Sequence, residues 1–79
     1  MEKQQIDIYI SNNCNESNEA IDYLTQRNID FSIKNISQHK EYLYELHQQE
    51  IYITPAIIID KNHQILGFQQ NKITELIKA

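Results

Sequence analysis

The chain has 79 residues, which suffice for one compact domain but not for two, because so short a chain can bury only a small core. Hydrophobic residues make up 41% of it, a composition typical of globular proteins. Eleven acidic residues against seven basic ones give a formal net charge of -4, and no cluster of Lys or Arg could follow a phosphate backbone. We therefore expect a single domain, residues 1–79, that does not bind nucleic acid.

The sequence also argues against a membrane or a secreted location. No stretch approaches the roughly 18 to 20 consecutive apolar residues of a membrane span, and Glu2, Lys3 and Asp7 interrupt the region where a signal peptide needs an apolar centre. Because Cys14 is the only cysteine, no internal disulfide can form, and an oxidising compartment is not implied. We expect a cytoplasmic monomer.

The first half of the chain has the pattern strand, helix, strand. Residues 5–10 alternate isoleucine with other side chains, at the period of two that is typical of a strand. Residues 14–27 repeat apolar side chains at helical spacing, with Asn13 as the expected N-cap. Residues 29–34 alternate again and predict a second strand, which a helical connection makes parallel to the first.

The second half predicts a helix, a hairpin and a final helix. Ser37 is the expected cap of a helix that runs to about Gln49. The apolar run 56–59 is typical of a central strand, residues 60–63 form a turn, and residues 64–66 complete a hairpin. A last helix begins near Asn71. The order β-α-β-α-β-β-α requires an α/β sandwich of two or three layers around a four-stranded mixed sheet.

Cys14 lies directly after a predicted strand and at the start of a predicted helix. Free backbone N–H groups and the helix dipole favour thiolate over thiol there, so we expect a modestly lowered pKa, opposed by Glu16 and Glu19. A lone cysteine can also be an inert, buried apolar residue. Ser17 could bond the thiolate or orient substrate, but a serine in a first helical turn more often satisfies a backbone group, which is the interpretation we favour.

Three short segments, in this order and spacing, resemble the small glutaredoxin-like redoxins. They are Ile8 to Ser11 leading into Cys14-Asn15-Glu16-Ser17, then Ile53-Thr54-Pro55, then Leu66-Gly67-Phe68. The likeness extends from Ile6 to Ile77 and is closest to a monothiol, Cys-x-x-Ser variant. It implies a thioredoxin-like, glutaredoxin-type fold in which helices flank the four-stranded mixed sheet.

The resemblance implies thiol–disulfide exchange with Cys14 as the nucleophile. Thr54 and a cis-Pro55 would form the ledge that binds an extended substrate, and Gly67 and Phe68 would border the groove. Ser17, counted with the substrate-binding residues, stands where a resolving cysteine would be, so an external thiol has to complete the cycle. The implied partners are protein or small-molecule disulfides and a low-molecular-weight thiol as co-substrate, with no cofactor.

Several positions depart from the family pattern. Glutaredoxins use a basic residue three positions before the nucleophile and a late Gly-Gly-x-Asp turn for glutathione, whereas this chain has Ser11 and Leu66-Gly67-Phe68-Gln69. Asn15-Glu16 does not match the iron–sulfur branch of the family. The histidines lack the spacing of a zinc site, so no metal is expected. The alternative function is a redox-inactive thioredoxin-like module that binds a partner or peptide at the Thr54-Pro55 ledge.

Overall fold

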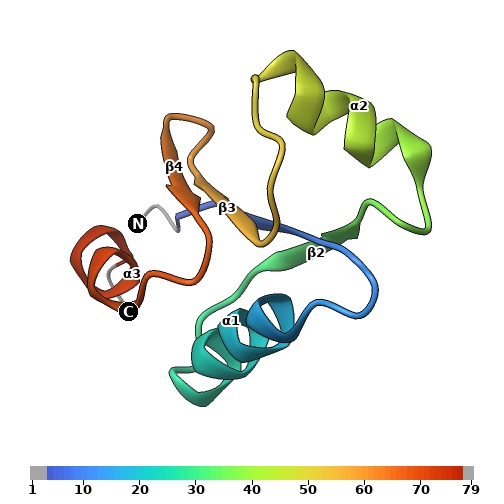
Figure 1. Cartoon of the computed structure of the whole chain (residues 1–79). Coiled ribbons are helices and arrows are strands. Elements are labelled where there is room, and N and C mark those ends of the chain that lie inside the picture. The colour runs from blue at the N-terminus through green and yellow to red at the C-terminus, as the bar shows by residue number, and fades with distance from the viewer. Residues whose placement is uncertain (1–3, 78–79) are drawn as a thin grey trace.

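The computed structural model describes residues 4–77, which form four strands and three helices (Figure 1). The elements are β1 (Ile6–Ile10), α1 (Asn15–Gln26), β2 (Ser32–Asn35), α2 (Lys40–Gln48), β3 (Ala56–Ile59), β4 (His63–Leu66) and α3 (Gln70–Leu76). The order β-α-β-α-β-β-α is the one that the sequence predicts. None of these helices is long and apolar enough to cross a membrane.

The four strands form one mixed sheet in the order β2-β1-β3-β4. β1 runs parallel to β2 and antiparallel to β3, and β3 and β4 form the hairpin. Because β1 and β3 are antiparallel, the end of β1 lies beside the beginning of β3, with Tyr9 opposite Ala56. This pairing brings the segment after β1, which contains Cys14, to the segment before β3, which contains Thr54 and Pro55.

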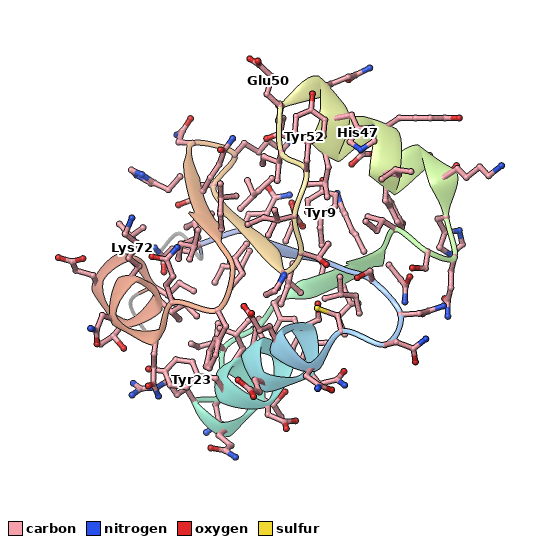
Figure 2. The ribbon with its side chains drawn as sticks, viewed as in Figure 1. Tyr9, Tyr23, His47, Glu50, Tyr52 and Lys72 are labelled. Atoms are coloured by element: carbon pink, nitrogen blue, oxygen red, sulfur yellow. The ribbon has the colours of Figure 1, made fainter. Side chains whose placement is uncertain are left out.

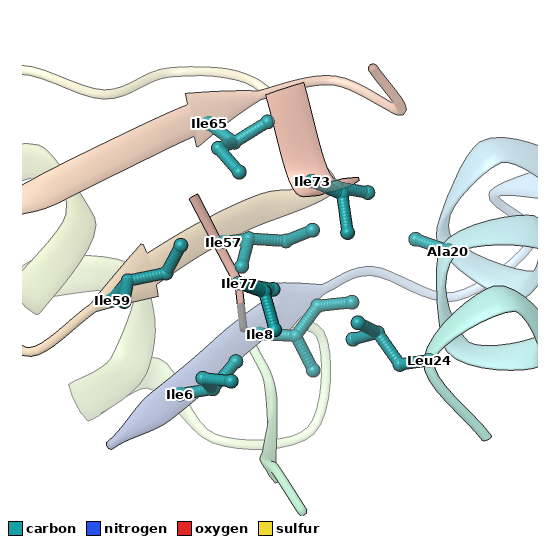
Figure 3. Packing of buried hydrophobic residues seen from close by; sticks show 9 residues of the cluster. All are labelled: Ile6, Ile8, Ala20, Leu24, Ile57, Ile59, Ile65, Ile73 and Ile77. Carbon is teal, nitrogen blue, oxygen red and sulfur yellow. The ribbon is translucent and has the colours of Figure 1, made fainter. Parts of the chain in front are cut away.

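Helices cover both faces of the sheet, which makes three layers (Figure 1). α1 and α3 pack on one face around a core of isoleucines from the strands, shown in Figure 3. The buried residues of this cluster are Ile6, Ile8, Ala20, Leu24, Ile57, Ile59, Ile65, Ile73 and Ile77. α2 packs on the other face, where the buried residues are Tyr9, Leu46, Ile51, Ala56 and Ile58. Alternate residues of β1 and β3 therefore serve the two cores, as the period of two requires.

The start of α1 differs from the expectation. Cys14 itself is the N-cap residue and has extended backbone angles, while Asn13 has a φ of 58° and is not the cap. Asparagine is one of the few residues that tolerate this left-handed conformation, so Asn13 turns the chain from β1 into the helix. The helix has no side-chain cap, and Cys14 contributes its carbonyl oxygen to the Asn18 N–H at 3.2 Å.

β2 and α2 begin later than the sequence predicts. β2 starts at Ser32, opposite Asp7, so residues 29–31 precede the paired part of the sheet. α2 starts at Lys40 with His39 as its N-cap, because Asn35 Oδ1 accepts the backbone N–H groups of Ser37 and Gln38 and holds residues 35–38 in a turn.

Candidate active site

Cys14 is held at the N-terminal end of α1 by a loop that is fastened to its neighbours. The Asn12 N–H donates to Ser37 Oγ at 3.0 Å, and Asn35 donates to the Asn12 side chain at 3.1 Å. Ser11 Oγ lies 2.8 Å from Thr54 Oγ1 across the gap between the two segments. The thiol itself is half-buried, so it is both positioned and accessible.

Thr54, the residue before Pro55, lies directly against the sulfur. Thr54 Oγ1 is 3.8 Å from Cys14 Sγ, and the Cys14 thiol faces the Thr54 carbonyl oxygen at 3.9 Å. The Thr54–Pro55 bond is cis, as the family resemblance implies. The Pro55 carbonyl accepts the Gly67 N–H at 2.8 Å, which ties this segment to the loop after β4.

The hydroxyl of Ser17 does not bond a backbone group within residues 4–77, contrary to the interpretation that we favoured from sequence. Its side chain is 1% exposed, and its oxygen has no hydrogen-bond partner in this part of the chain. A hydrogen bond from the Ser17 hydroxyl is the main reason that the pKa of Cys14 is lowered, and it outweighs burial, which raises that pKa. The Ser17 N–H and the hydroxyls of Thr54 and Ser11 lower it further.

The direction of the pKa shift agrees with the expectation from sequence, but its causes are local. The first-turn N–H of Ser17 contributes in the way expected of a helix N-terminus. The larger contribution is from a side-chain hydroxyl, and neither Glu16 nor Glu19 is among the leading causes. Hydrogen bonds to the charged sulfur therefore decide the shift, because they act at contact distance while exposed carboxylates are screened by water.

Gly67 and Phe68 lie on the other side of Pro55. Gly67 has a φ of 78°, a left-handed conformation that favours glycine. The Phe68 ring packs edge-on against Tyr23 of α1 with centroids 5.8 Å apart, at the margin of the core. The Phe68 backbone N–H points instead to Glu16 and donates to its Oε2 at 3.3 Å.

A hollow of about 250 Å³ lies between α2 and the segment before β3. Its lining residues are Ser11, Ile36, Leu43, Leu46, His47, Ile51, Tyr52, Ile53 and Thr54. Ser11 and Thr54 also contribute to the Cys14 site, so the hollow adjoins the thiol. Figure 2 shows His47 and Tyr52 beside each other on the α2 side, where their ring centroids are 5.1 Å apart and Tyr52 is 71% exposed.

Comparison with known proteins identifies the fold and the family. The family model described as glutaredoxin matches residues 6–64, which is more than half of the chain. The chain belongs to the glutaredoxin family. Among proteins with curated functions, no match was found.

Solved structures agree with this glutaredoxin assignment. The glutaredoxin-like NrdH-redoxin from Escherichia coli is 25% identical, with a TM-score of 0.83 over 95% of this chain and 97% of that one. The thioredoxin-like protein BC3987 is 22% identical, with a TM-score of 0.86 over 92% of this chain and 100% of that one. A glutaredoxin from Methanosarcina mazei is 20% identical, with a TM-score of 0.75 over 90% of this chain and 75% of that one. All share the thioredoxin-like architecture.

In this glutaredoxin-family chain, the residues singled out from sequence come together to different degrees. Cys14, Ser17, Thr54 and Pro55 form one contiguous group, and Gly67 joins it through Pro55. The Phe68 side chain lies apart from the sulfur, on Tyr23. Sequence reasoning did not assign Ser11 to the site, although its position three residues before Cys14 was a usable signal. Within residues 4–77, no His, Cys, Asp and Glu side chains gather in a group that could hold a metal ion.

Proposed function

We propose that the protein is a monothiol thiol–disulfide oxidoreductase with Cys14 as its nucleophile. The observation that carries this proposal is the set of donors around the sulfur. The Ser17 hydroxyl and N–H, together with the hydroxyls of Thr54 and Ser11, lower the pKa of Cys14 and so favour the thiolate, which is the form that attacks disulfides. Donors that stabilise a thiolate would serve no purpose at a cysteine with a purely structural role.

The reaction is two successive exchanges at one sulfur. The Cys14 thiolate attacks one sulfur of a disulfide, the substrate S–S bond breaks, and the other half leaves as a thiolate that takes up a proton. Cys14 is then joined to the first half in a mixed disulfide. Because Ser17 cannot supply a second sulfur, an external thiol attacks this mixed disulfide, takes over the first half and releases Cys14 as thiolate.

Protein disulfides suit the surroundings of the thiol. Thr54 of the Thr54-Pro55 ledge lies against Sγ, and the adjoining hollow offers room for a side chain next to the target cysteine. The Escherichia coli neighbour is described as a glutaredoxin-like protein with a thioredoxin-like activity profile, and we extend a comparable preference to this chain. The low-molecular-weight thiol acts only as the second partner.

The test follows the mass of the intact protein. Incubation of the reduced protein with hydroxyethyl disulfide should add one mercaptoethanol, and Cys14→Ser should remove this adduct. Added cysteine should restore the parent mass at a rate that rises with cysteine concentration, because only an outside thiol can resolve the adduct.

Ser17→Cys is the matched variant for the monothiol mechanism. A second sulfur one helical turn away is close enough to form a disulfide with Cys14. The new thiol should therefore attack the mixed disulfide, release the adduct without added thiol and leave an internal disulfide with Cys14. If Cys14 is alkylated readily but forms no adduct with any disulfide, the redox-inactive module that binds a partner at the Thr54-Pro55 ledge is the better description.

A further inference from the structure

Glu16, two residues after Cys14, reaches from the first turn of α1 to the loop that follows β4. Its Oε2 accepts the Phe68 N–H at 3.3 Å and lies 3.6 Å from the position that a Cβ on Gly67 would occupy. The carboxylate therefore rests on the Gly67-Phe68 backbone. Within residues 4–77, Glu16 takes part in no ion pair, so no bonded cation neutralises its charge.

A short series of contacts connects this carboxylate with the reactive sulfur. Gly67 donates its N–H to the Pro55 carbonyl at 2.8 Å, and the Thr54 carbonyl faces Cys14 Sγ at 3.9 Å. Glu16 thus stands at the far end of the same ledge on which a substrate attached to Cys14 would lie. A charged group carried next to the substrate sulfur and directed toward the Gly67-Phe68 backbone would approach the Glu16 charge.

We propose that Glu16 is a specificity-determining residue that makes Cys14 favour thiols and disulfides with cationic or neutral groups beside the sulfur over carboxylate-bearing ones. The inference rests on the proposed function and names the class of substrate for it. It concerns the charge of Glu16, which is distinct from its hydrogen bond to Phe68, because an uncharged acceptor could keep that bond.

The expected size of the effect on the rates follows from Coulomb's law for charges in water. A unit charge about 6 to 10 Å away in water changes a rate by about twofold to threefold, so a cationic and an anionic probe should differ by about fivefold at low ionic strength. Salt at about 1 M reduces the Debye length to about 3 Å and should remove most of this difference.

The experiment measures adduct formation at Cys14 with three symmetric disulfides: cystamine, hydroxyethyl disulfide and dithiodiglycolate. Each reaction joins one half of the probe to Cys14 and releases the other half as a thiol, and intact mass gives the rate. In Glu16→Gln, which retains an oxygen to accept the Phe68 N–H, the ratio of cystamine to dithiodiglycolate rates should fall by about fivefold. Because the same two probes are used for the parent and for each variant, their intrinsic reactivities cancel when these rate ratios are compared.

Glu19→Gln is the control, because Glu19 is exposed one turn along α1 and its side chain forms no hydrogen bond or ion pair within residues 4–77. The substitution removes the same charge, but Glu19 makes no bond to the Gly67-Phe68 backbone. The ratio of cystamine to dithiodiglycolate rates should therefore change by less than about twofold. An unchanged ratio in Glu16→Gln, or equal changes in the two variants, would overturn the proposal.

A second pair of probes separates this inference from the proposed function. Iodoacetate and iodoacetamide alkylate the same thiol and differ in charge, and Glu16→Gln should speed iodoacetate relative to iodoacetamide by about twofold. If Cys14 forms no adduct with any disulfide, the proposed function fails while the alkylation ratio still decides the role of Glu16. If disulfides react but neither ratio responds to Glu16→Gln, only the inference on Glu16 fails.

Discussion

At the scale of single residues, the most informative group is the buried Ser17 hydroxyl. A buried hydroxyl without a partner destabilises a fold, and Ser17 Oγ has none within residues 4–77. Hydrogen bonding from this hydroxyl is the largest of the causes that lower the pKa of Cys14, so we expect the thiolate to be its acceptor. We therefore expect Ser17 to act on Cys14 and not as a side-chain cap of α1.

Replacing Ser17 by Ala should raise the pKa of Cys14 toward that of a free thiol, because it removes the largest contribution to the lowered value. The rate of iodoacetamide alkylation at pH 7 should fall several-fold, as the thiolate fraction drops. Ser11→Ala removes the donor that lowers this pKa least, so it should have a smaller effect. Equal pH profiles for the parent and Ser17→Ala would show that the hydroxyl does not bond the sulfur.

The sign of the linked stability change is also determined. Because the pKa of Cys14 is lower in the folded chain, its ionisation stabilises the fold above the unfolded pKa of about 8.5, and this contribution is lost as the pH falls through the folded value. Ser17→Ala should thus lose more stability relative to the parent at alkaline pH than at acidic pH, measured by urea unfolding.

At the scale of elements, α2 is fastened to the sheet by one polar cluster. Tyr9 of β1 donates its hydroxyl to Glu45 of α2 at 2.8 Å, and Lys34 of β2 lies 3.6 Å from Glu45 and 3.9 Å from Asp7. Figure 2 shows Tyr9 between the sheet and α2. Burial and the bond to Glu45 raise the pKa of Tyr9, so its hydroxyl remains a donor. The cluster thereby holds α2, which lines one side of the hollow beside Cys14.

Tyr9→Phe should destabilise the protein by about 1 kcal/mol, because it removes the hydrogen bond to the partly solvated Glu45 carboxylate and the longer one from Lys34 Nζ at 3.4 Å, while keeping the ring in place. Urea unfolding measures the change. Tyr44→Phe is the control on α2, since Tyr44 is 59% exposed and should tolerate the loss of its hydroxyl. Similar stability changes in the two variants would mean that the Tyr9–Glu45 bond does not hold α2.

At the scale of the whole molecule, β1 and β3 form the most deeply buried part of the sheet because both of their faces are covered. Every residue of β3 is buried, whereas β2 at the edge of the sheet has none that is fully buried. Both cores include residues of β1 and β3. The Cys14 site lies where the end of β1 comes beside the beginning of β3. The site therefore depends on the integrity of the sheet centre.

Ile57→Val and Ile33→Val form a matched pair, since both positions are opposite Ile8 on its two sides. Ile57 is 0% exposed, and losing one buried methylene there should cost about 1 kcal/mol. Ile33 is 50% exposed and should lose only a few tenths of that. The difference in unfolding free energy, measured in urea, should be large enough to resolve; equal losses would contradict the arrangement of the core.

The sequence by itself determined the element order, the strand-to-helix position of Cys14 and the Thr54-Pro55 segment, because periods of two and 3.6 and short motifs are local properties. Only the tertiary structure decided where α2 begins, that the Ser17 hydroxyl is buried without a partner within residues 4–77, and that Glu16 rests on the Gly67-Phe68 backbone. The burial of Ser17 and the contact of Glu16 depend on segments far apart in the chain. The start of α2 depends on which of several polar side chains bonds the backbone, here Asn35, and no periodic pattern records that choice. A helical period shows which side chains lie on one face of a helix. Which residues that face contacts is decided only when the helix packs on the sheet.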